Sequence, residues 1–86
     1  MTTFAVKRNL PSITMEQLGV AQKAAVETSN QFTEKGIDVK YIRSNFFPDS
    51  SCICLFEAVN REAVKAVNEK AGIPFDNISE VLDLTP

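Results

Sequence analysis

The side chains that could carry chemistry lie mostly between positions 41 and 57. Tyr41, Arg43 and Asn45 alternate along one expected strand, Glu57 lies on the next strand, and Glu80 lies near the C-terminus. An arginine is suited to bidentate binding of a carboxylate or phosphate, and a partly buried glutamate with a raised pKa can act as a base. We treat these five residues as candidate ligand-binding residues and assign no catalytic residue. The competing interpretation is an ion pair between Arg43 and a glutamate, within the sheet or across a dimer interface.

Cys52 and Cys54 form a Cys-x-Cys pair, which invites a metal or redox interpretation. Two thiolates complete neither a tetrahedral zinc site nor a catalytic Cys–His pair, and the sequence contains no histidine. Neighbouring same-face residues of a strand are also at or past the limit for a disulfide. We therefore predict buried thiols that pack as small apolar groups, with no metal site and no cofactor.

Charged and aromatic residues near the strand ends have two interpretations each. Lys7 and Arg8 could clamp an anionic ligand, but charges at a strand end more often serve solubility. Phe46 is expected in the core from its parity along the strand, and Phe47, next to Pro48, is expected at the hairpin tip. Glycine-rich phosphate loops and Ser–His–Asp arrangements are absent from the sequence.

Composition limits the class of protein. The 86 residues predict a single domain over positions 1–86, and 44% hydrophobic with 23% charged residues is typical of a globular chain. A net charge of −2 and scattered lysines and arginines argue against nucleic acid as a partner. No apolar run is long enough for a signal peptide or a membrane span, so we expect a cytoplasmic protein with no membrane partner.

Local signals predict two helices. Thr14 and Gln17 have the form of a capping box, and an apolar face follows at spacings of three and four until Gly36 ends the helix. Asn60 caps a second helix, which Gly72 ends. The residues of the two apolar faces are Leu18, Ala21, Ala25, Thr28 and Phe32 in the first helix, and Val64, Val67 and Ala71 in the second.

Four strands are expected, over residues 3–8, 37–47, 51–58 and 77–84. A three-residue loop between the two middle strands would pair Phe47 with Ser51. At steps of two residues away from the loop, the same register continues to the pair of Tyr41 with Glu57. This register gathers a nearly apolar set against the helices: Ile42, Ser44, Phe46, Cys52, Cys54 and Phe56. The opposite face would carry Tyr41, Arg43, Asn45, Ile53, Leu55 and Glu57, a mixture typical of a partner or ligand surface. In the last strand, Ile78 and Leu82 lie on one face and Val81 lies on the other. The sequence therefore does not decide which face of this strand points inward.

The order βαββαβ predicts an α+β, ferredoxin-like fold. Right-handed crossovers put both helices on one face of a four-stranded antiparallel sheet and leave the other face open. A chain of this size buries a marginal core, and a second copy is the simplest cover for the open face. We therefore expect a homodimer.

Several segments resemble a known family. Val39 to Ser44, Cys54 to Ala58, Gly72-Ile73-Pro74 and Ile78 to Val81 are similar to small bacterial ferredoxin-like domains of unknown function, and Lys7 to Pro11 fits one branch of that family. The family includes a nickel-binding protein. The resemblance implies a dimeric αβ-barrel, similar in shape to muconolactone isomerases and small ferredoxin-like monooxygenases. Cys54, Glu57 and Glu80 stand at matching positions, but the histidines of the nickel-binding branch are missing here.

These observations favour a dimeric, non-catalytic module that binds a small molecule or a partner protein over the open sheet face. The main alternative is a cofactor-free isomerase- or monooxygenase-like enzyme that uses the same space, with Glu57 or Glu80 as base and Arg43 as anion anchor. Nickel binding is a further alternative, and the absence of histidine argues against it.

Overall fold

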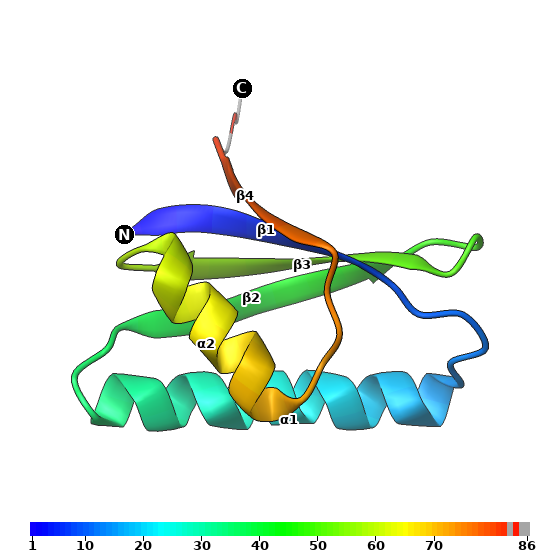
Figure 1. Cartoon of the computed structure of the whole chain (residues 1–86), viewed down its shortest axis with the longest axis horizontal. Helices are drawn as coiled ribbons and strands as arrows, with labels where there is room; N and C mark the ends of the chain where they lie inside the picture. Colours follow the sequence, from blue (N-terminus) through cyan, green and yellow to red (C-terminus); the bar gives the residue numbers. More distant parts are fainter. Residues whose placement is uncertain (83, 85–86) are drawn as a thin grey trace.

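The computed structural model describes residues 1–82 and residue 84, and the chain runs through six elements (Figure 1). The strands are β1 (Thr2–Asn9), β2 (Val39–Phe46), β3 (Ser51–Ala58) and β4 (Asn77–Val81). The helices are α1 (Met15–Glu34) and α2 (Arg61–Ala71). The expected order βαββαβ is confirmed.

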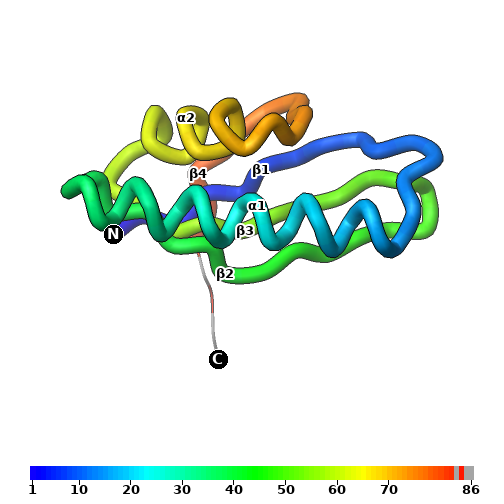
Figure 2. The backbone as a smooth tube through the Cα atoms, turned by 90° about the horizontal axis from the view of Figure 1, so that it is seen from below, coloured from blue at the N-terminus to red at the C-terminus, as the bar shows by residue number. Residues whose placement is uncertain are grey.

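The four strands form one antiparallel sheet in the order β2-β3-β1-β4. Both helices lie on one side of this sheet, and Figure 2 shows α1 lying lengthwise along the strands on that side. α1 packs mainly on β2, α2 packs on β3 and β4, and the helices contact each other. This arrangement is the ferredoxin-like α+β fold that the sequence predicts.

Both predicted helix starts are present. Thr14 and Gln17 make the reciprocal bonds of a capping box, so α1 begins with two of its free backbone donors satisfied. Asn60 accepts a hydrogen bond from the backbone N–H of Ala63 at 2.9 Å and caps α2. α2 ends at Gly72, whose φ of 72° lies in the left-handed region that suits glycine.

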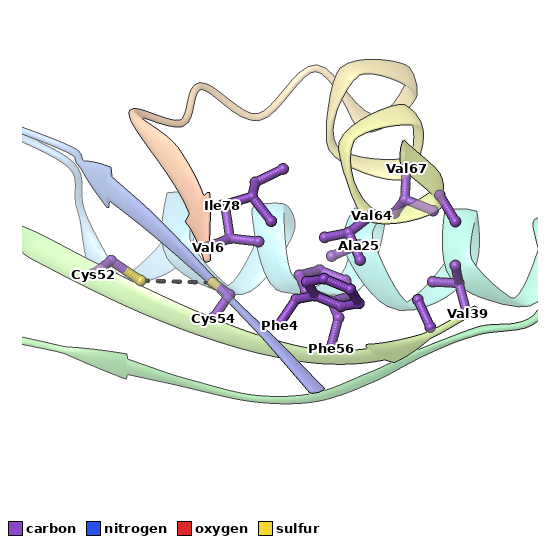
Figure 3. Close-up of a cluster of buried hydrophobic side chains, with 12 residues drawn as sticks. Phe4, Val6, Ala25, Val39, Cys52, Cys54, Phe56, Val64, Val67 and Ile78 are labelled. Carbon is purple, nitrogen blue, oxygen red and sulfur yellow. Dashed lines mark hydrogen bonds between the residues drawn. The ribbon is translucent and has the colours of Figure 1, made fainter. Parts of the chain in front are cut away.

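The core lies between the helices and the covered face of the sheet. Because alternate residues of a strand share a face, Phe4 and Val6 of β1 point inward together with Phe56 of β3. In Figure 3 the rings of Phe4 and Phe56 lie together at the centre of the buried cluster. Fully buried Val64 and Val67 close the cluster from α2.

The central hairpin follows the predicted register only near its tip. Asn45 pairs with Ile53 and Arg43 with Leu55 as expected, but a β-bulge between Tyr41 and Arg43 then shifts the pairing. Tyr41 consequently lies opposite Phe56 instead of Glu57.

The bulge changes which face its neighbours occupy. Tyr41 was expected on the open face, and this is wrong: its ring packs edge-on against Phe56 on the covered face, with 5.5 Å between ring centroids. Ile42 was expected in the core, and it is instead the extra residue of the bulge, half-buried and outside the group of side chains packed on the core. One inserted residue reverses the face of every residue before it.

β4 is shorter than the expected strand over 77–84. It ends at Val81, and position 83 lies outside the described residues. Ile78 pairs with Val6 and is buried, which settles the inward face of this strand. Leu82 follows the strand and is exposed.

Candidate functional site

A cavity of about 260 Å³ lies between the N-terminal half of α1 and the covered face of the sheet. Its floor comes from the ends of β1, β2 and β3, and Ile73 closes it on the side of α2. We call it the α1 pocket. Its lining residues in the described chain are Arg8, Leu10, Met15, Leu18, Gly19, Ala21, Gln22, Ala25, Tyr41, Ser44, Phe46, Cys52, Cys54 and Ile73.

The pocket exists because α1 presents small side chains to this part of the sheet. Gly19, Ala21 and Ala25 lie along the wall, and a Cβ atom added to Gly19 would meet no other atom within 4 Å. The capping box fixes the start of α1 and thereby the position of this wall.

Arg8 is the charged residue of the pocket lining. It lies directly opposite Cys52 on the covered face, and only 3% of its surface is exposed. Its Nη1 donates to the backbone oxygen of Pro74 at 3.2 Å, and its Nη2 donates to Oδ1 of Asn68 at 2.8 Å. Its Nε has no hydrogen-bond partner in the described chain. A buried guanidinium is therefore held by neutral acceptors alone.

Asn68 fixes the Arg8 side chain from α2. It is fully buried, and its Nδ2 donates to the backbone oxygen of Val64 at 2.8 Å. This bond orients the amide so that Oδ1 faces the guanidinium. Asn68 lies four residues after Val64, on the apolar stripe of the helix, where a polar residue needs such a partner.

A row of hydrogen-bonding groups crosses the pocket floor. Nε2 of Gln22 donates to the Tyr41 hydroxyl at 3.0 Å, and that hydroxyl lies 2.6 Å from Oγ of Ser44. Ser44 Oγ lies 2.9 Å from Sγ of Cys54, which lies 3.8 Å from Sγ of Cys52. We call this row the polar strip. It reaches Arg8 at its cysteine end, because Cys52 and Arg8 are cross-strand neighbours.

The two cysteines are buried free thiols, as predicted. They project side by side from β3, and the dashed line in Figure 3 joins their sulfur atoms. Burial, and after it the neighbouring Cys54, raise the pKa of the Cys52 thiol from 9.0 to about 11, against the opposing effect of Arg8. Cys52 therefore stays protonated at neutral pH, which makes it a poor nucleophile.

The structure separates the five predicted site residues. Tyr41 lies in the α1 pocket. Arg43 and Asn45 lie on the open face, opposite Leu55 and Ile53, and both are exposed. Glu57 is half-buried on the same face, where the bulge places Lys40 directly opposite it.

Glu80 lies far from the other candidates. It pairs with Phe4 at the β4 edge, on the covered face, and it is exposed. Because β2 and β4 are the two outer strands, Glu80 and Arg43 lie at opposite edges of the sheet and on opposite faces. The described residues of one chain give Arg43 no carboxylate within 4.0 Å.

Sequence reasoning undervalued one residue of the site and missed another. Arg8 was considered as a clamp for an anionic ligand but interpreted as a strand-end charge, although its even parity with Phe4 and Val6 already placed it on the covered face. Asn68 was not singled out, although it falls on the apolar stripe of the second helix. Phe46, expected in the core, is on the predicted face but stays 40% exposed at the rim of the pocket.

Neither a cluster of metal-ligating side chains nor a membrane-spanning helix occurs in the described part of the chain. Over residues 1–82 and 84, no group of three or more His, Cys, Asp or Glu side chains lies close enough to hold an ion. Over the same residues, neither helix is long and apolar enough to cross a membrane.

Comparison with known proteins identifies the family. Among solved structures, SCO4226 from Streptomyces coelicolor A3(2) matches with a TM-score of 0.80 and 29% sequence identity, over 96% of this chain and 99% of that chain. No curated protein matches. The family model described as "Nickel responsive protein SCO4226-like" matches residues 4–81. The chain therefore belongs to the SCO4226-like family of nickel responsive proteins.

Proposed function

We propose that the protein is a cytoplasmic, homodimeric module that binds a small molecule in the α1 pocket. The observation that carries the proposal is the pocket itself, a space of about 260 Å³ with apolar walls and a polar strip on its floor. Ligand sites combine these two features, and this one falls just below the roughly 300 Å³ at which drug-sized pockets begin. The ligand is therefore small.

The lining chemistry favours binding over catalysis. The lining residues that the structure describes include no carboxylate and no histidine, so the pocket offers no ordinary general base. Cys52 is protonated at neutral pH because its pKa is raised to about 11. Glu57, the base of the enzyme alternative, lies on the open face, away from this space.

Dimerisation through the open face is part of the proposal. Ala5, Ile53 and Leu55 lie in the middle of that face. Both described helices lie on the other side of the sheet (Figures 1 and 2). Both charge signs border them, from Arg43 on β2 and Glu57 on β3. A two-fold interface buries the same surface on both copies, so these opposite charges can pair across it.

Nickel is left out of the proposed function. The family description names a nickel response, and that description rests on other members. This chain has no histidine, and its two cysteines form no larger ligand group within the described residues. Two thiols alone do not fit a nickel centre of nitrogen and oxygen ligands.

The pocket is tested with two pairs of small probes, benzoate with benzamide and hexanoate with hexanamide. We expect amide resonances of pocket residues to shift with at least one probe in protein NMR titrations. Ala21→Phe, which places a ring in the pocket wall, should abolish the shifts, and Val20→Phe, on the exposed side of the same helix, should leave them. Absence of binding by all four probes, or equal binding to Ala21→Phe, would show that the pocket is not a ligand site.

A further inference from the structure

The α1 pocket contains a buried cation with no carboxylate within 4.0 Å in the described chain. Arg8 is 97% buried, and the pocket lining in the described chain includes no aspartate or glutamate. Taking a guanidinium out of water costs several kcal/mol unless a partner charge or full hydrogen bonding compensates. Neither is complete here, because the two acceptors of Arg8 are neutral and its Nε is unpartnered.

We propose that Arg8 anchors the carboxylate of a small organic acid whose apolar body lies in the α1 pocket. This inference rests on the proposed function and names the chemical class of its ligand. A carboxylate supplies what the pocket lining lacks, a negative charge and a charged acceptor for the guanidinium. Arginine suits this group because its planar fork matches the two carboxylate oxygens.

The hydrogen bonds already present restrict how Arg8 can move. A guanidinium has five N–H groups, and the bonds to Pro74 and Asn68 use two of them. Those two bonds come from two different nitrogens and reach a loop and a helix, so they hold the guanidinium plane in one orientation. The anchor is thus fixed before the ligand arrives, which lowers the entropy lost on binding.

The rest of the pocket defines the ligand body. Leu10, Leu18 and Ile73 give apolar walls, and Phe46 stands at the rim. The cavity of about 260 Å³ admits a short aliphatic chain or one aromatic ring. The polar strip can accept or donate one hydrogen bond to a substituent away from the acid group, through Ser44 or Tyr41.

The experiment compares each acid with its amide, because the two members of a pair differ in charge and hardly in shape. Calorimetric or NMR titration should give benzoate or hexanoate an affinity about tenfold or more above that of its amide, as a charge-assisted bond predicts. The chain has three arginines, and Nε–H resonances report each one separately. The acid, and not the amide, should shift the resonance of Arg8, which Arg8→Lys identifies by its disappearance.

The titrations separate the Arg8 anchor from the pocket as a binding site. Equal affinity for acid and amide, or an acid that shifts only the resonances of Arg43 or Arg61, overturns the Arg8 anchor while the pocket remains a binding site. Binding of neither overturns the proposed function together with the anchor. Arg8→Met, with a side chain of similar length and no charge, should bind acid and amide equally. The NMR readout on the unmodified protein keeps the test valid even where that variant fails to fold.

Discussion

Replacing Asn68 with leucine tests the buried polar pair directly. The change removes the amide oxygen that accepts from Arg8 Nη2 at 2.8 Å, and leucine keeps the same number of side-chain heavy atoms in the same branched shape, so no cavity forms. The bond between Asn68 Nδ2 and the Val64 oxygen is also lost, but that oxygen remains the acceptor of the helical backbone bond. The main effect is one lost hydrogen bond to a buried charge.

We expect the free energy of unfolding to fall by about 1.5–3 kcal/mol, the usual range for a hydrogen bond to a charged group. The full range applies because Arg8 is 3% exposed and water cannot replace the lost acceptor. In a chain of this length such a loss lowers the melting temperature by about 6 °C or more. Urea unfolding at one fixed protein concentration measures it, since the stability of the proposed dimer would depend on concentration.

Two further variants complete the experiment. Asn30→Leu, at an exposed position of α1, is the matched control and should change stability by less than about 0.5 kcal/mol. The double variant Arg8→Met with Asn68→Leu removes both polar partners and should regain much of the loss. A loss of under about 0.5 kcal/mol in Asn68→Leu, or a double variant as unstable as the sum of its parts, would refute the reasoning.

Three other predictions concern the open face, metals and the thiols. Leu55→Asp puts a charge in the middle of the open face and should shift sedimentation at micromolar concentration from dimer to monomer; a wild-type protein that is monomeric there contradicts the proposed interface. Calorimetric titration should detect no tight nickel or zinc site, and stoichiometric sub-micromolar binding by the folded protein would be the contrary result. Because folding raises the pKa of Cys52 from 9.0 to about 11, the folded state holds this proton more tightly, so stability is full below about pH 9 and falls as the pH rises through 11. Cys52→Ala should show a smaller fall over that window in urea unfolding at constant ionic strength, and an equal fall would mean that another group titrates.

Local physics explains what the sequence could predict. Helix ends follow from short-range groups such as Thr14 with Gln17, or the left-handed Gly72, and the structure has both. Strand alternation placed Cys52 and Cys54 on the covered face because their neighbours on β3 repeat the same period. These features depend on a few adjacent residues, which a sequence displays directly.

Features that arise from pairing or packing were missed. The bulge at Ile42 has no marker in its own residues, since it appears only when β2 is paired with β3, and it moved Tyr41 into the pocket. The pocket depends on how far α1 stands from the sheet. Arg8 was considered as an anion clamp but taken for a strand-end charge, because its charge was weighed more heavily than its alternation with Phe4 and Val6.

The bulge also affects one of the two outer edges of the sheet. β2 is an outer strand, and a strand at the edge of a sheet presents unpaired N–H and C=O groups on which another chain can add a strand. The extra residue at Ile42 interrupts that row, and the other outer strand, β4, is only five residues long. Both edges are therefore poor templates for strand addition. Growth of an edge-to-edge fibre is therefore discouraged at both sides, and the open face stays available for the proposed contact with a second copy.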